Sequence, residues 1–420
     1  MPSPLLAQRR VLAATSLSYV LVILDTSIVN VALERIAATL HTGISGLQWV
    51  VSAYTLSFAS LLLSGGALGD RFGARRLYLV GLVVFTLASL LCGVSGDWMT
   101  LVAARVLQGV GAALLVPGSL TLINQAFAND PAGRATAIGV WASCGGIAMA
   151  AGPLVGGVLI ELFGWRSIFL ANLPLGLIAI GLSARLAASE RSPRALDVRG
   201  QLSAILALAT LIGVLIEGPV RGWSSTPILL AGLLSVAAWG TFIRIEIRHA
   251  QPMLPLKLFA NSVFSACVAV SLISALMLYG LVFLLSLYFQ RVLGYSPLWT
   301  GLAFLPLTAL VSLGSLVAGR LVKAWGSERL IGVALLLYLA GFGPLLLYGP
   351  TTSYLWIALP MPVIGLAAGL ITPAATSALM GTVDKHRAGI AAGTLNAARQ
   401  VGAALGVALF GGLLAGHIRA

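Results

Sequence analysis

The stretch LVAARVLQGVGAALLVPGSL, residues 101–120, decides the fold class of this chain. It is apolar or small at almost every position and is long enough to cross a bilayer as a helix. Arg105 lies within it. An arginine held in hydrocarbon costs several kcal/mol, so its side chain must face a partner or a water-filled path. The obvious partner is Asp25 in the first apolar segment, and the pair predicts machinery that moves a charged species, commonly a proton.

The composition extends this prediction to the whole chain. Of the 420 residues, 59% are hydrophobic and only 9% are charged, with a mean hydropathy of +1.01. So few charges cannot cover a soluble protein of this length. Backbone groups in lipid must be hydrogen-bonded internally, which predicts an all-α polytopic membrane protein. We predict thirteen membrane helices, at residues 11–33, 47–68, 76–96, 99–124, 135–160, 167–186, 200–219, 227–245, 262–289, 298–320, 329–348, 354–379 and 388–415.

The formal net charge of +13 comes from 25 Lys and Arg residues against 12 Asp and Glu residues. A surplus of this size could indicate nucleic-acid binding, but its distribution argues against that. When the loops are numbered from a cytoplasmic N-terminus, most Lys and Arg residues fall on the cytoplasmic side, as the positive-inside rule requires. We therefore expect a multi-pass protein of the bacterial cytoplasmic membrane, with its N-terminus inside, the lipid bilayer around it and no nucleic-acid partner.

The chain divides into two halves with an insertion between them. We predict an N-terminal six-helix bundle in residues 1–186, a charged cytoplasmic linker with two additional helices in 187–250, and a five-helix bundle in 251–420. The sequence GRLVKAWGSERL (319–330) loosely echoes GDRFGARR (69–76), as the same loop in two repeats would. Paired membrane repeats with a cavity between them near the midplane are the architecture of secondary transporters.

The first and fourth predicted helices each carry a polar face. Asp25, Thr26 and Asn30 share one sector of the first helix, and Arg105 and Gln108 are three residues apart on the fourth. We predict that Asp25 and Arg105 couple protons, because an acid beside a cavity can take up a proton on one side and release it on the other. The alternative is a fixed ion pair that only braces the two helices.

Polar and aromatic side chains elsewhere are candidates for the walls of a substrate cavity. The set Asn396, Arg399 and Gln400 is spaced at i, i+3 and i+4, which places it on one helix face. A structural hydrogen-bond network would give the same pattern, and isolated aromatic residues more often pack or face lipid. The cavity candidates are Asn30, Trp49, Tyr54, Gln108, Trp141, Asn396, Arg399 and Gln400.

Two glycine-bearing motifs are candidates for moving parts. The 69–76 loop combines glycines that permit a tight turn with charged groups that reach helix ends, so it can latch one side of the protein. Plain loop topology is its alternative. In GIAMAAGPLVGG (146–157), the proline kinks the helix and the glycines allow close packing, which suits a hinge, a seal or only a packing face. The gating-loop candidates are Gly69, Asp70, Arg71, Gly73, Arg75 and Arg76, and the hinge candidates are Gly152, Pro153, Gly156 and Gly157.

Other chemistries have no basis in the sequence. There is no GxxxxGK[ST] loop that could hold the phosphates of ATP. There is no Ser/His/Asp constellation or metal-ligand spacing, and Cys92, Cys144 and Cys267 are scattered among the apolar segments. We expect no enzymatic activity, no metal and no cofactor. The proton gradient is the expected energy source, and a monomer is the expected working unit.

The motifs together resemble the signatures of the major facilitator superfamily. Its general motifs are similar to LDTSIVNVAL (24–33), GDRFGARR (69–76), RVLQGVGAA (105–113) and GPLVGG (152–157). Its 14-helix drug:proton antiporter branch, of the multidrug efflux type, is similar in its two extra central helices and in WRSIFLANLPLG (165–176), YFQRVLGYSPLWTGLAFLP (288–306) and AGIAAGTLNAARQVGAALGVALFG (388–411). The resemblance covers nearly the whole chain and lacks only the last helix of that branch.

This resemblance implies two helical bundles that alternate access to a central cavity. It implies the export of small amphipathic compounds, often cationic, in exchange for protons. It matches Asp25 and Arg105 to positions implicated in proton coupling, and the Gly-Pro element at 152–153 to the antiporter motif. Two alternatives stay open: an exporter of one metabolite, such as an amino acid, a siderophore or an antibiotic, and a non-transporting or truncated membrane protein, which the missing fourteenth helix motivates.

Overall fold

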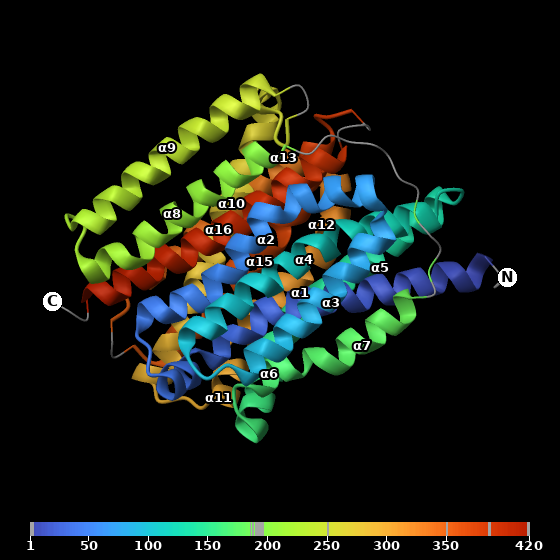
Figure 1. Cartoon of the computed structure of the whole chain (residues 1–420). Helices are drawn as coiled ribbons and strands as arrows, with labels where there is room; N and C mark the ends of the chain where they lie inside the picture. The colour runs from blue at the N-terminus through green and yellow to red at the C-terminus, as the bar shows by residue number, and fades with distance from the viewer. Residues whose placement is uncertain are drawn as a thin grey trace.

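The computed structural model describes residues 4–184, 186, 189, 197–249, 252–349, 352–384 and 388–417, and the regular elements within these ranges are all helices (Figure 1). Twelve of these helices are long and apolar enough to cross a membrane. The predicted segment 167–186 instead forms a shorter apolar stretch, Ser167–Ser183. The predicted all-α membrane fold is confirmed.

The first half of the chain begins with long helices, two of which start at capping aspartates. Its helices are α1 (Pro4–Leu40), α2 (Ile44–Phe72), α3 (Ala74–Val94), α4 (Trp98–Ala126), α5 (Pro131–Phe163), α6 (Ser167–Leu170) and α7 (Asn172–Ser183). Asp97 and Asp130 accept hydrogen bonds from backbone N–H groups in the first turns of α4 and α5. Between α2 and α3 the chain turns at Gly73, whose φ of 95° favours glycine.

The second half follows the additional helix pair, α8 (Val198–Arg221) and α9 (Thr226–Arg248), whose members pack on each other. Its elements are η1 (Leu256–Ala260), α10 (Ser262–Leu287), the π-helix η2 (Tyr288–Val292), α11 (Pro297–Ala303), α12 (Leu305–Trp325), α13 (Ser327–Leu345), α14 (Tyr354–Ala358), α15 (Met361–Met380) and α16 (Ala388–His417). Two predicted segments, 298–320 and 354–379, are each divided into two helices beside a proline. Proline lacks a backbone N–H, so a helix readily restarts there.

The two halves repeat one pattern of helix packing. In the first half α1 packs on α5, and α4 packs on both α2 and α3. In the second half α10 packs on α16, and α15 packs on both α12 and α13. The halves then meet reciprocally, with α2 against α16 and α5 against α11 and α12. Two equivalent bundles related by a twofold axis give this arrangement, and α8 packs across the α2–α16 contact.

The two halves are in close contact toward one end of the molecule. We call the end where α1 begins the N face and the end where α16 ends the C face, and they lie on opposite sides in Figure 1. Toward the C face, Arg291 of η2 pairs with Glu34 of α1, and Ser286 of α10 donates to the Asn30 carbonyl. A Cβ added to Gly157 would lie only 2.8 Å from the Leu298 Cα, so the backbones touch there. The seam between the halves is therefore closed at the C face.

The limits of the three predicted regions, 1–186, 187–250 and 251–420, stay a prediction. Positions 187, 250 and 251 lie outside the described residues, and so does most of the predicted charged linker. The packing on either side of these positions is compatible with the division, because the α8–α9 pair lies outside both bundles.

Candidate functional site

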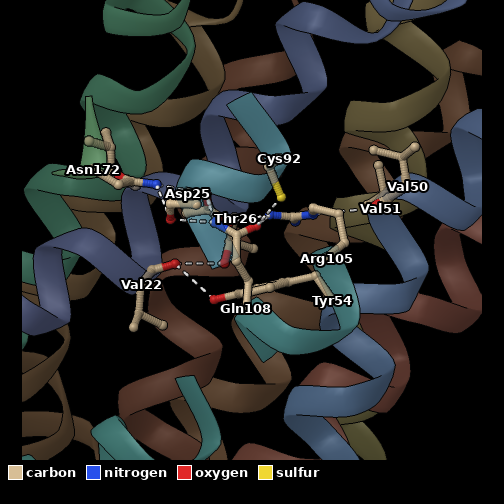
Figure 2. Close-up of polar contacts among 12 residues, drawn as sticks. Val22, Asp25, Thr26, Val50, Val51, Tyr54, Cys92, Arg105, Gln108 and Asn172 are labelled. Carbon is tan, nitrogen blue, oxygen red and sulfur yellow. Dashed lines mark hydrogen bonds and ion pairs between the residues drawn. The ribbon is translucent and has the colours of Figure 1, made fainter. Parts of the chain in front are cut away.

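Arg105 and Asp25 face each other inside the first half of the molecule. Arg105 extends from α4 and Asp25 from α1, and the guanidinium Nη1 binds the carboxylate Oδ2 directly (Figure 2). Their exposed fractions are 1% and 0%, so the pair is sealed from water. The sequence predicted that these two residues meet. Their role in proton coupling stays a prediction.

A hydrogen-bond network joins this ion pair to α2 and α7. The Arg105 Nε donates to the Val50 carbonyl at 3.1 Å, and its Nη1 also donates to Gln108 Oε1 at 2.8 Å. The other carboxylate oxygen, Asp25 Oδ1, accepts from Gln108 Nε2 at 3.1 Å and from Asn172 Nδ2 at 3.0 Å. Both carboxylate oxygens therefore have donors.

Aromatic rings cover the guanidinium. The Tyr54 ring centre lies 4.3 Å from the Arg105 Cζ, and the Phe169 ring centre lies 5.8 Å from it. A desolvated cation gains about 2 kcal/mol from such a contact. Removing one partner of a buried ion pair costs ~3–5 kcal/mol, because the other charge is left uncompensated. The pair is therefore a strong constraint on how α1 and α4 can move.

A cavity lies between the two halves, separate from the ion pair. It is small, with a volume of about 30 Å³. Helices α1 and α5 line it from one side and α10 and α12 from the other, with Asn30, Met149, Tyr279, Phe304 and Thr308 among the lining residues. None of its lining residues is charged. The wall is mainly apolar, with a few hydroxyl and amide groups.

Of the predicted cavity residues, Asn30 lines this cavity, whereas Tyr54 and Gln108 belong to the Arg105 network. The Trp49 Nε1 donates to Glu217 Oε1 on α8 at 3.0 Å. Trp49 therefore faces the additional helix pair.

The remaining cavity candidates lie near the seam on α5 and α16. Trp141 is buried and stacks on Tyr19 of α1, with ring centres 3.8 Å apart. On α16, Asn396, Arg399 and Gln400 are all half-buried, and the Arg399 Nη1 donates to Asn396 Oδ1 at 3.3 Å.

The predicted gating loop is held within its own half. The Arg75 Nη2 donates to the Ala184 carbonyl at 2.6 Å, just beyond the end of α7. Arg71 lies over the Phe72 ring at 5.5 Å, and Arg76 is exposed. Gly73 makes the turn that the motif predicted. The contact of a loop arginine with a helix C-terminus agrees with the dipole argument, and gating by the loop stays a prediction. The loop's other predicted members are Gly69, which is buried, and Asp70, which is half-buried.

The predicted hinge on α5 is packed on both sides. A Cβ at Gly152 would lie 1.8 Å from Ser27 Oγ, and one at Gly156 would lie 2.6 Å from an Ile28 side-chain carbon. Both neighbours belong to α1, whereas Gly157 touches the other half, as described above. Pro153 lines the cavity. The glycines therefore seal two helix contacts, and whether the segment also bends stays a prediction.

Three residues of the site were not found by sequence reasoning. Asn172 binds Asp25, and its signal was an amide in an otherwise apolar segment. Tyr19 and Tyr279 lie beside the seam in α1 and α10, where an aromatic residue gives no pattern that separates a cavity wall from packing.

The sequence profile of the Major Facilitator Superfamily matches residues 15–407. The chain belongs to this superfamily. It is 39% identical over 411 residues to the methylenomycin A resistance protein of Bacillus subtilis, covering 96% of this chain and 86% of that protein. It is 35% identical over 412 residues to the multidrug resistance protein Stp of Mycobacterium tuberculosis, covering 97% and 76%. These relatives are resistance proteins of a transporter family, not enzymes.

Solved structures show the same fold. A bacterial homologue of the human lysosomal transporter Spinster, in an inward-facing and unoccupied conformation, matches with a TM-score of 0.66 at 17% identity, covering 97% of this chain and 82% of that chain. The human transporter MFSD10 matches with the same TM-score and identity, covering 99% and 95%. At this identity the likeness concerns the fold alone.

Proposed function

We propose that this protein exports small amphipathic molecules of the drug or antibiotic kind in exchange for protons, by alternating access across the bacterial cytoplasmic membrane. The observation that carries the proposal is an ion pair buried in one bundle of a molecule whose two bundles enclose a separate cavity and are joined at one face. In this proposal the N face is cytoplasmic and the C face is outside. The present arrangement then faces inward.

The Asp25 carboxylate is the proposed proton carrier. In the present arrangement it is charged and bound by Arg105, Gln108 and Asn172. A proton from the outside removes the charge that holds Arg105, so protonation weakens the link between α1 and α4. One charge that moves through 100 mV supplies about 2.3 kcal/mol, which is enough for useful accumulation.

The relatives' names support a drug or antibiotic as the exported molecule. One is a multidrug resistance protein, and two are named after a single antibiotic: the methylenomycin A resistance protein and, at 33% identity over 420 residues, the tetracenomycin C resistance and export protein of Streptomyces glaucescens. Export of one antibiotic is therefore the second candidate function. The same monomeric pump would serve either role.

A susceptibility screen in a bacterial host that lacks its own pumps tests this function. Cells that express the protein should tolerate higher concentrations of some amphipathic compounds, and an uncoupler should abolish the difference. Tolerance to many unrelated compounds would indicate a multidrug pump, and tolerance to one would indicate the narrower role. Tolerance that survives the uncoupler would contradict proton coupling, and no change for any compound would favour a non-transporting protein.

A further inference from the structure

Helix α8 of the additional pair contacts both bundles, because it packs on α2 of the first and on α16 of the second (Figure 1). These two helices also meet each other at the seam, where the Gln48 Nε2 donates to the Val407 and Ala408 carbonyls at 3.0 and 2.8 Å. Alternating access rotates the bundles against each other. Helix α8 must then keep one of its two contacts and shift over the other.

The contact of α8 with α2 is made by hydrogen bonds near both faces of the molecule. Toward the N face, the Gln201 Nε2 donates to the Ser60 carbonyl at 2.7 Å, and its Oε1 accepts from the Ser64 hydroxyl. Toward the C face, the Trp49 Nε1 donates to Glu217 Oε1 at 3.0 Å. Gln201 is buried, so a shift along α2 would leave its amide groups without partners or water, which is costly.

The contact of α8 with α16 is apolar. Its buried side chains are Ile212 and Ile216 of α8 with Ala404 and Ala408 of α16. None of these side chains has a hydrogen-bonding group. Dispersion contacts between such side chains are individually weak and have no preferred direction, so a small shift exchanges them for similar ones. The α8–α16 contact is therefore the one that can slide.

The elements after α8 are joined to the same side. The Ser235 hydroxyl of α9 donates to the Ala207 carbonyl of α8 at 3.1 Å. Beyond α9, the Leu254 N–H donates to Glu246 Oε2 at 2.9 Å, and the Met253 sulfur lies 3.6 Å from the Ser64 Oγ of α2.

Four residues after Leu254, the chain packs with the second bundle. Leu258 is buried in a cluster with Phe264 of α10, Ala375 of α15 and Leu395 of α16. The attachment of the chain therefore changes from the first bundle to the second between Leu254 and Leu258.

We propose that α8 and α9 are a fixed part of the first bundle, that α8 slides over α16 during transport, and that the hinge between the two moving bodies lies at residues 255–257. This inference rests on the proposed function, because it needs the bundles to alternate. It places the mechanical boundary beyond the predicted limit at residue 250, since Met253 and Leu254 are still joined to α2 and α9.

Crosslinks at the two contacts of α8 test this attachment. Ser64→Cys with Gln201→Cys joins α8 to α2. Pro219→Cys with Gly412→Cys joins α8 to α16, because a Cβ at Gly412 would lie 3.1 Å from the Pro219 Cγ. The reagent 1,2-ethanediyl bismethanethiosulfonate links each pair through reducible disulfides, and mass spectrometry measures the linked fraction. The native cysteines stay in place, and each single variant treated with the reagent is the control.

The α8–α16 crosslink should abolish uncoupler-sensitive efflux, and dithiothreitol should restore it. The α8–α2 crosslink should leave efflux unchanged. Efflux that survives a complete α8–α16 crosslink, or that is lost with the α8–α2 crosslink, would overturn the inference. If the Pro219→Cys/Gly412→Cys protein aggregates, Leu215→Cys with Gly412→Cys replaces it, since the Leu215 carbonyl is 3.4 Å from the same Cβ position.

Pulsed EPR on purified protein tests the attachment without transport. Spin labels are placed at exposed positions in a variant whose native cysteines are replaced by serine: Leu233→Cys on α9 with Leu87→Cys on α3, and Leu233→Cys with Leu336→Cys on α13. The α9–α3 distances should be distributed more narrowly than the α9–α13 distances. An α9–α3 distribution that is equally broad or broader would reject the attachment. Absence of efflux in the untreated wild type would instead reject the proposed function.

Discussion

Arg105 and Arg399 each interrupt an apolar helix, one in each bundle, yet their surroundings are opposite. Arg105 is 1% exposed, is bound to Asp25 and is covered by Tyr54. Arg399 is half-buried and has one described hydrogen bond, to Asn396. The difference teaches that two arginines in apolar helices can be engaged very differently: Arg105 is committed to its bundle by several internal partners, whereas Arg399 has a single described hydrogen bond and is partly exposed.

The largest effect expected from this comparison is on stability. Arg105→Ala leaves the Asp25 charge buried without a cation, so it should lower the free energy of unfolding by ~3–5 kcal/mol and abolish resistance. Arg399→Ala removes one hydrogen bond from a half-buried position, so it should cost at most about 1 kcal/mol. The detergent-solubilised variants are heated, and gel filtration measures the fraction that has not aggregated at each temperature. This ranks the stability losses of the two variants. Equal losses of stability would show that the two arginines are not differently engaged.

Substitutions at two glycines of α5 compare the closed C face with the middle of the seam, and they test whether the close backbone contact seals the C face. Gly157→Ala would place a methyl group 2.8 Å from the Leu298 Cα, which should cost about 1–3 kcal/mol and open the C face. The expected readout is a proton leak in vesicles without substrate. Gly146→Ala is the matched control on the same helix, because a Cβ there meets nothing within 4 Å. A leak of similar size in both variants would show that the seal does not depend on the close contact.

The smallest effect concerns the ion pair at the C face. Glu34 and Arg291 are about a third exposed, in contrast to the sealed Asp25–Arg105 pair, so Glu34→Gln should cost only about 0.2–1 kcal/mol. Because the pair joins the two bundles in the present arrangement, its loss should favour opening at the C face. The proton leak of vesicles without substrate, compared between the wild type and Glu34→Gln, reports that opening, and it should be smaller than the leak of Gly157→Ala. A stability loss as large as that of Arg105→Ala would contradict this ranking.

The sequence was sufficient for the class of fold and for the central ion pair. A charge in hydrocarbon has few possible partners, so Arg105 alone indicated Asp25. Helix breaks at prolines, such as the one between α14 and α15, could not be predicted, because a membrane helix can also kink at proline and continue.

The walls of the cavity were mostly beyond sequence reasoning. Tyr54 and Trp49 look like cavity residues in sequence, but one covers Arg105 and the other binds Glu217 on the additional helix pair. The reason is physical: an aromatic ring in a membrane helix suits a core, a cavity wall and lipid alike, and only the rotation of its helix decides. Asn30 lines the cavity because its helix turns that face to the seam.

The most direct test of the account measures proton movement by the Asp25→Asn variant. Purified protein is reconstituted into liposomes that hold a pH gradient, and a substrate identified in the susceptibility screen is added. With the wild type the substrate should dissipate the gradient. With Asp25→Asn it should not, although exchange of labelled for unlabelled substrate should continue, because the cavity between the bundles is intact. If Asp25→Asn moves protons with substrate at the wild-type rate, Asp25 is only a brace for α1 and α4, and the proposed coupling is wrong.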